Sequence, residues 1–201
     1  LLEKVADGYR LTGSGQAALT HLQQLRASVD GARHLEPVLE YVDSSRLVEN
    51  VDLFTDATII EADAEAPYAI EQHLESIIAD ADECIYGGAT SFGSPTTLAR
   101  TVERVEAGVE FEWALPRAVL DRIVSQHGEL HATVRAHDNA TVYVLEDVVV
   151  DFSVYDDTLV LTGFDDDRGT LSAVATTDDP EARAWADGIF ATYRERGQRL
   201  D

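Results

Sequence analysis

The residues that could do acid–base or nucleophilic chemistry are few and far apart in this sequence. It holds six histidines, one cysteine (Cys84) and one lysine (Lys4). A phosphodiesterase that attacks with an imidazole needs a nearby lysine to balance the phosphate charge, in a His-x-Lys pair. Because Lys4 is far from every histidine, we predict no catalytic residues of this kind. The remaining enzymatic alternative is a hydrolase that uses paired carboxylates, such as Asp151 with Asp156.

Metal ligands do not occur at a useful spacing. Among the histidines, His127 and His131 stand four residues apart, but Gly128 between them predicts that the helix has already ended. The acidic run Asp165–Gly169 lacks the alternating ligands and closing glutamate of a calcium loop, and we interpret it as a solvated hairpin tip. Cys84 lies in an apolar strand-like run, which favours a buried, inert thiol. We expect neither a metal nor a cofactor.

A loop of small residues is the best candidate for a ligand site. Glycines and hydroxyl residues between Gly87 and Ser94 could offer N–H groups and hydroxyls to an anion at the start of the next helix. Arg100 would then pair with an acidic ligand, while a plain loop is the alternative. Aromatic residues of nearby strands could close the pocket, although such residues usually form core. The predicted ligand-binding residues are Tyr86, Thr90, Ser91, Arg100, Trp113, Phe152 and Tyr155.

The charge balance is strongly acidic. Asp and Glu total 38 against 15 Lys and Arg, which gives a net charge of −23. Self-repulsion of this kind is screened in concentrated salt, where the Debye length falls to about 3 Å at 1 M. The composition therefore favours adaptation to a salt-loaded cytoplasm, with an acidic protein of an ordinary cell as the alternative. It also disfavours tight DNA binding by this chain alone, because phosphate contacts need clustered Lys and Arg.

No segment predicts a membrane location. The sequence contains no apolar run of the ~18–20 residues that a membrane helix needs, and no signal segment precedes the first strand. We therefore expect a cytoplasmic protein. The chain has no methionine and opens on Leu1-Leu2-Glu3, so we also expect it to be part of a longer protein.

The first 30 residues predict a hairpin and a helix. Strand-like pieces at Leu2–Val5 and Tyr9–Thr12 flank Asp7-Gly8, a dipeptide typical of tight turns. Ser14 is a candidate helix N-cap, and apolar residues recur at helical spacing over Gln16–Val29.

The rest of the chain alternates between helical and strand periods. Expected helices lie at residues 35–50, 68–81, 96–107 and 116–126, and expected strands at 54–61, 83–87 and 109–115. From residue 131 the period changes to two, which predicts strands at 132–136, 141–145, 148–155, 158–163 and 170–175, closed by a helix over Pro180–Arg199. The predicted class is α/β, or mixed α+β, with helices layered on a mixed sheet and an antiparallel C-terminal meander.

Several segments of the C-terminal half carry a family pattern. They are a hairpin at Phe164–Gly169, a helix cap at Thr177–Ala182, Trp185, and Phe190 with Tyr193 on the last helix. This pattern resembles the effector domain of archaeal Fil-type methanogenesis regulators, and the similarity spans most of residues 68–200. It implies a homodimeric winged-helix regulator whose C-terminal domain senses a ligand. Such domains are commonly compared with the phospholipase-D-like fold of archaeal sugar-sensing regulators.

The N-terminal hairpin, with the sequence LTGSGQAAL after it, resembles the wing of an archaeal winged-helix domain and the helix that leaves it. The resemblance implies DNA contacts through Lys4 and Arg10. It divides the chain into a remnant wing with linker helix (residues 1–30) and an effector and dimerisation domain (residues 31–201).

The sequence thus predicts the effector-sensing and dimerisation region of a DNA-binding transcription regulator, in which ligand binding changes operator affinity. Its expected partners are DNA, a second copy of the chain and a small-molecule effector, with no membrane. Dimer contacts are expected through Gln16–Val29 and the C-terminal helix. The alternative is a protein-interaction module that binds no small ligand.

Overall fold

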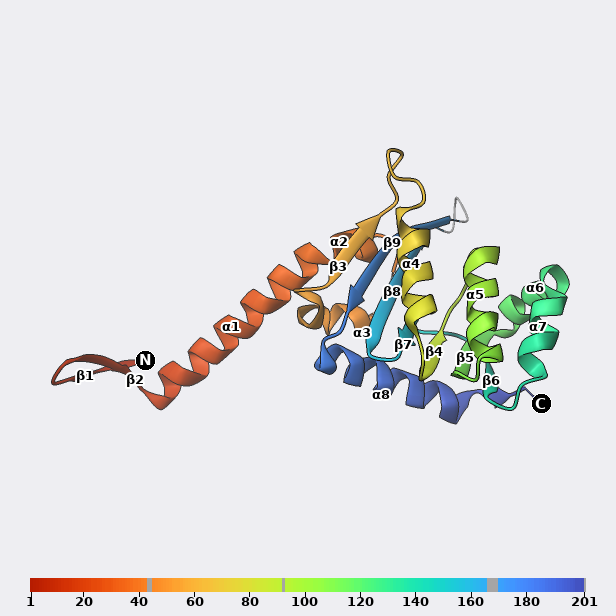
Figure 1. Cartoon of the computed structure of the whole chain (residues 1–201). Helices are drawn as coiled ribbons and strands as arrows, with labels where there is room; N and C mark the ends of the chain where they lie inside the picture. Colours follow the sequence, from red (N-terminus) through yellow and green to blue (C-terminus); the bar gives the residue numbers. More distant parts are fainter. Residues whose placement is uncertain (43–44, 92, 166–169, 201) are drawn as a thin grey trace.

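The computed structural model describes residues 1–42, 45–91, 93–165 and 170–200. An eight-stranded sheet, in the order β10-β6-β5-β4-β7-β8-β9-β3, forms the body of the molecule (Figure 1). In chain order the strands are β3 (Thr58–Glu61), β4 (Cys84–Gly88), β5 (Glu110–Pro116), β6 (Ala140–Leu145), β7 (Phe152–Tyr155), β8 (Thr158–Asp165), β9 (Thr170–Thr177) and β10 (Gln198–Arg199).

Helices cover both faces of the sheet. One face packs against α4 (Ala69–Asp80), α5 (Pro95–Glu106), α6 (Arg117–Gln126) and α7 (Gly128–Arg135), and the other against α8 (Pro180–Arg196), α2 (Glu36–Leu39), α3 (Ser45–Val48) and the 3₁₀ turn η1 (Val51–Phe54). Successive strand residues alternate between the two cores: Ile85 joins the α4–α7 side, and Tyr86 joins the α8 side. The mixed α/β class predicted from the sequence is confirmed.

The sheet combines two kinds of pairing. β4, β5 and β6 are parallel neighbours, and the helices that connect them lie over the sheet. β7, β8 and β9 form an antiparallel meander, which β3 extends at its edge. The predicted meander therefore holds for these strands, whereas β6 belongs to the parallel half.

The predicted strand at 132–136 is wrong, because these residues lie in and just after helix α7. The edge of β6 that such a strand would need is taken by β10, whose Gln198 and Arg199 pair with Val144 and Tyr143. The segment instead forms a helix, and Val134 packs against the core beside β6. A second helix thus follows α6 almost at once, with only His127 between them.

The long helix predicted at 35–50 is also wrong. Two four-residue helices, α2 and α3, replace it, and Pro37 lies in the first turn of α2. Leu35, Val38 and Leu47 are fully buried against the body, so packing decides the path of this segment. The strand expected at 54–61 begins only at Thr58, because residues 51–54 form η1.

Three smaller corrections concern the ends of elements. The N-cap of the first long helix is Thr12 rather than Ser14: the Thr12 side chain accepts a hydrogen bond from the Gly15 N–H at 3.1 Å. The strand expected at 148–155 is paired only over its last four residues. The last helix ends at Arg196, because Gly197 lets the chain approach Tyr143 closely and turn into β10.

The N-terminal segment stands away from the body (Figure 1). The hairpin of β1 (Leu2–Val5) and β2 (Gly8–Leu11) is confirmed, and α1 (Gly13–His34) follows it. The far end of α1 is fixed to the body at two points: Gly31 lies against the Val51 carbonyl, where a Cβ would come within 2.2 Å of the oxygen, and His34 Nε2–H donates to the Ala57 carbonyl at 2.6 Å. None of the described helices has the length and apolarity needed to cross a membrane.

Candidate ligand-binding cavity

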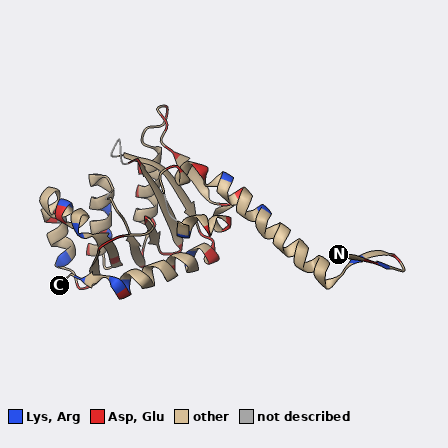
Figure 2. Cartoon of the chain, turned by 180° about the vertical axis from the view of Figure 1, so that it is seen from behind, with Lys and Arg blue, Asp and Glu red and all other residues tan. Residues whose placement is uncertain are grey.

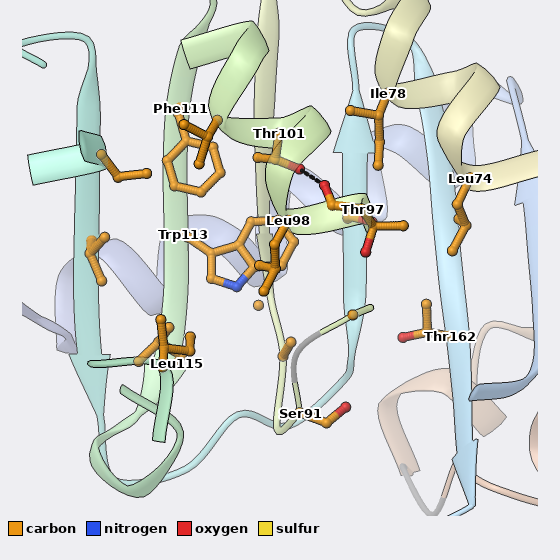
Figure 3. Close-up of a pocket in the computed structure, with 18 of the residues that line it drawn as sticks. Leu74, Ile78, Ser91, Thr97, Leu98, Thr101, Phe111, Trp113, Leu115 and Thr162 are labelled. Atoms are coloured by element: carbon orange, nitrogen blue, oxygen red, sulfur yellow. Dashed lines mark hydrogen bonds between the residues drawn. The ribbon is translucent and has the colours of Figure 1, made fainter. Parts of the chain in front are cut away.

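A cavity of about 190 Å³ lies between the sheet and the helices of the α4–α7 face (Figure 3). Strand β5 forms its floor, since Phe111, Trp113 and Leu115 all point to this face. The Phe111 and Trp113 rings are stacked, with centroids 5.8 Å apart and planes within 3°. These two rings form the aromatic part of the floor.

Helix α5 forms the opposite wall. Ser94 caps it by accepting from the Thr97 N–H at 3.2 Å, and Pro95 occupies the first turn. One helical turn separates Thr97 from Thr101, so both lie on the cavity side with Leu98 next to them.

The hydroxyl protons of this wall are already in use. Thr97 Oγ1 donates to the Ser94 carbonyl at 2.9 Å, and Thr101 Oγ1 donates to the Thr97 carbonyl at 3.0 Å. The two hydroxyls can therefore offer lone pairs to a ligand without giving up these bonds.

Helix α7 closes one end of the cavity with His131, next to His127 at the start of the helix. His131 Nε2 is buried, and among the described residues it is the buried side-chain polar atom that lacks a hydrogen-bond partner. Burial, with a smaller effect of the Arg135 charge, lowers the pKa of His131. The imidazole is therefore neutral at neutral pH, and this lining residue carries a hydrogen-bonding atom that no described residue uses.

Four of the predicted ligand-binding residues border this cavity: Ser91, Trp113, Phe152 and Tyr155. Ser91 lies in the loop after β4, at one end of the group of lining residues (Figure 3). The Phe152 ring itself packs on the other face of the sheet, 6.5 Å from the Trp185 ring and 6.2 Å from that of Tyr193.

The other three predicted residues are not in the cavity lining. Tyr86 faces α8, where its hydroxyl donates to Asp187 and accepts from Arg183 Nε at 2.8 Å. Burial, then the bond to Asp187, raises the pKa of Tyr86. Thr90 donates through its N–H and its hydroxyl to Asp151, at 2.9 and 2.7 Å.

Arg100 is exposed and forms an ion pair with Glu103 at 2.8 Å. It extends from the outer side of α5, and Thr97 and Thr101 face inward. The structure thus does not bring Arg100 to the space enclosed by the loop and the sheet.

Sequence reasoning missed the histidines of this site. The i,i+4 spacing of His127 and His131 was the available sign, and Gly128 hid it because we read that glycine as the end of a helix. In the structure Gly128 begins α7, and the His131 N–H donates to the His127 carbonyl at 3.1 Å.

The two carboxylates considered for hydrolysis lie at opposite ends of β7. The four residues of β7 lie between Asp151 and Asp156, so the two Cα atoms are about 16 Å apart over five extended steps. Paired carboxylates in glycosidases stand roughly 5–10 Å apart. Asp156 accepts from the backbone N–H groups of Asp82, Glu83 and Cys84 at 2.8–2.9 Å. Partial burial opposes these bonds, but they outweigh it and lower the pKa of Asp156. Asp156 thus fixes the start of β4.

The described residues contain no group of three or more His, Cys, Asp or Glu arranged to hold a metal ion. Of the acidic run compared with a calcium loop, residues 166–169 lie outside the described residues. Cys84 is a free thiol, and burial is the largest of the effects that raise its pKa.

Residues 67–196 match the family described as methanogenesis regulatory protein FilR1, middle domain. The chain belongs to this family. The match covers every strand from β4 to β9 and all four helices that surround the cavity. No curated protein matches the sequence.

Solved structures share the fold at low sequence identity. TrmBL2, an archaeal chromatin protein with a novel mode of DNA binding, is 11% identical with a TM-score of 0.56, over 100% of this chain and 76% of its own. The phospholipase D family member Nuc of Salmonella typhimurium is 14% identical with a TM-score of 0.54, and the match covers 72% of this chain and 97% of Nuc. NucT from Helicobacter pylori is 13% identical with a TM-score of 0.57, and the match covers 72% of this chain and 99% of NucT. TrmBL2 thus resembles the N-terminal arm as well as the body.

Proposed function

We propose that this chain is the effector-sensing and dimerisation region of a cytoplasmic DNA-binding transcription regulator, with a wing and linker at residues 1–30 and a sensing domain at residues 31–201. The observation that carries the proposal is the helical arm, which holds the hairpin well away from a body that belongs to a regulatory family (Figure 1). An arm of this kind links a ligand-dependent body to a DNA-facing element.

The acidic charge of the chain lies almost entirely on the body and not on the arm. Residues 1–34 contain three acidic and four basic residues, while residues 35–201 contain 35 acidic and 11 basic residues. Figure 2 shows acidic residues spread over the body and few on the arm. A body of this charge is repelled by phosphate, so DNA would meet the hairpin, where Lys4 is exposed and Arg10 pairs with Glu3 at 2.6 Å.

The arm also offers a surface for a second copy. Ala18, Leu22, Leu25 and Val29 follow the alternating four- and three-residue spacing of a coiled-coil seam. Leu22 and Leu25 are 63% and 61% exposed. Two such helices side by side would bury this seam and place two hairpins at one end of a dimer, as winged-helix regulators need for paired half-sites.

We propose a sensor rather than an enzyme. Phospholipase-D-like catalysis needs a His-x-Lys pair, and the one lysine of the chain is in β1, on the hairpin. The cavity supports a sensing role because a ligand there would contact β5, α5 and α7 together. Binding would then stabilise one arrangement of these elements over others.

The dimer is tested by light scattering after size exclusion in molar KCl. We expect a mass of about twice 22.0 kDa. The double variant Leu22→Glu/Leu25→Glu should be a monomer, because it places like charges in the seam. Gln16→Glu/Gln23→Glu adds the same charge off the seam and should remain a dimer. A monomeric wild-type chain would contradict the dimer.

DNA binding is tested with the protein produced from its own gene, by crosslinking in cells and sequencing the bound DNA. We expect discrete sites for the wild type and their loss in Lys4→Glu/Arg10→Glu. Arg117→Glu/Arg122→Glu on α6 makes the same charge change far from the hairpin and should leave the sites in place. Absence of discrete sites for the wild type would overturn the regulator proposal.

A further inference from the structure

The cavity has a chemical character that contrasts with the rest of the chain. The whole chain carries a net charge of −23, yet none of the described residues that line the cavity is Asp, Glu, Lys or Arg. Most of the lining is aliphatic or aromatic. Arg100 of α5 is not part of the lining and is paired with Glu103.

Several polar groups at the cavity already have hydrogen-bond partners in the protein. Thr97 and Thr101 donate within α5, and Tyr155, which is buried, shares a hydrogen bond with Ser153. His131 Nε2 differs from these groups, because it is buried and lacks a partner among the described residues. A buried polar atom left unpaired destabilises the fold, so a ligand that supplied the missing hydrogen bond would gain affinity there.

We infer that this cavity binds an uncharged, largely apolar small molecule with one hydroxyl or similar neutral group that bonds to His131 Nε2. The inference names the ligand class of the sensor proposed above and rests on that proposal. A hydroxyl suits this atom because it can donate or accept, whichever imidazole tautomer is present. The stacked Phe111 and Trp113 rings would hold the apolar part.

The same features exclude an anionic ligand. A carboxylate or phosphate would lose its hydration in an apolar space without a cation to pair with it. The net charge of the chain would repel it further at low ionic strength. A sugar with many hydroxyls would place several of them against aliphatic and aromatic side chains, which offer no hydrogen bonds.

The test compares two probes of equal ring size, 2-naphthol and 2-naphthoate, by isothermal titration calorimetry of the full chain in molar KCl at neutral pH. Salt screens the overall charge, with a Debye length of about 3 Å at 1 M, so the difference reports the cavity. We expect 2-naphthol to bind, and 2-naphthoate to bind at least roughly tenfold more weakly, about 1.4 kcal/mol.

Three variants locate the binding. Ser91→Trp adds an indole ring at a lining position of the cavity and should abolish 2-naphthol binding. His131→Leu should weaken it roughly threefold to tenfold, as expected for one hydrogen bond. Arg100→Gln, on the outer side of α5, should bind both probes as the wild type does.

Tighter binding of 2-naphthoate than of 2-naphthol, or 2-naphthol binding that Ser91→Trp leaves unchanged, would overturn the inference. Either result leaves discrete DNA sites in cells unaffected, so it is distinguishable from failure of the regulator proposal. Conversely, loss of those DNA sites would leave a positive calorimetric result for the cavity standing.

Discussion

At the scale of single residues, burial lowers the pKa of two histidines, His73 and His131. His73 on α4 faces β9, where its Nε2 lies 3.2 Å from the Thr176 hydroxyl, and burial lowers its pKa. Burial lowers the pKa of His131 at the cavity as well. Both side chains are held neutral by the fold, whereas in the unfolded chain they titrate at an ordinary value of about 6.5.

These histidines predict a pH dependence of stability. When the folded pKa lies below the unfolded pKa, the unfolded chain binds more protons, so stability rises with pH. The contribution is complete above about 6.5 and is lost as the pH falls below that value. We expect the free energy of unfolding, from urea titrations in molar KCl, to fall between neutral pH and mildly acidic pH. His73→Gln should reduce that fall.

The control for this prediction is His21→Gln. His21 is an exposed residue of α1 and lies 3.2 Å from Gln24 Oε1. The variant His21→Gln should show the same dependence of unfolding free energy on pH as the wild type. An identical pH dependence in His73→Gln and the wild type would show that His73 is not the group responsible.

At the scale of elements, α8 is the helix that completes the core on its face of the sheet. Asp179 caps it by accepting from the Glu181 and Ala182 N–H groups at 2.7 and 3.1 Å. Phe190 is 1% exposed, and its ring lies 5.0 Å from that of Tyr86 and 6.3 Å from that of Tyr143. One aromatic side chain thus joins α8 to both β4 and β6.

Truncation of this side chain should therefore be costly. We expect Phe190→Ala to lower the free energy of unfolding by about 3–5 kcal/mol, the usual cost of an aromatic cavity in a core. Tyr68→Ala, at a site that is 65% exposed, removes a similar ring and should change stability by about 0.5 kcal/mol or less. Chemical denaturation of both variants measures the difference; equal losses would contradict the proposed role of α8.

At the scale of the whole molecule, the net charge of −23 is the dominant feature. Ion pairs offset little of it, because most of those in the described part of the chain are exposed, such as Arg26 with Asp30 and Arg117 with Asp121. Exposed pairs contribute about 0–1 kcal/mol each. Folding brings these carboxylates closer together, so it is opposed by their repulsion at low ionic strength.

Stability should consequently rise with salt. We expect the melting temperature to increase steeply from dilute buffer to molar KCl, where charges more than about 3 Å apart are screened at 1 M. Glycine betaine at matched osmolality carries no net charge and should produce a smaller increase. A melting temperature that responds equally to both solutes would show that charge screening is not the cause.

How much could be predicted depended on how local each feature is. The hairpin at residues 2–11 and helices α4, α5 and α6 follow from turn residues and periodicity, and their bounds in the structure lie within one residue of the prediction. The segments at 35–50 and 132–136 were mispredicted because their conformation depends on distant partners. In the segment 35–50, the conformation depends on Pro37 and on the burial of Leu35. In the segment 132–136, it depends on the pairing of β10 with β6.

The sequence by itself determined the charge of the molecule, the mixed class of its fold and the absence of a His-x-Lys pair. Only the tertiary structure decided which side chains share a space. Adjacent strand residues point to opposite faces of the sheet. Tyr86 therefore contacts α8, whereas Trp113 and Tyr155 line the cavity on the other face together with Ser91. Whether a strand residue faces α5 or α8 depends on which helix packs over it, and that packing joins segments far apart in the chain.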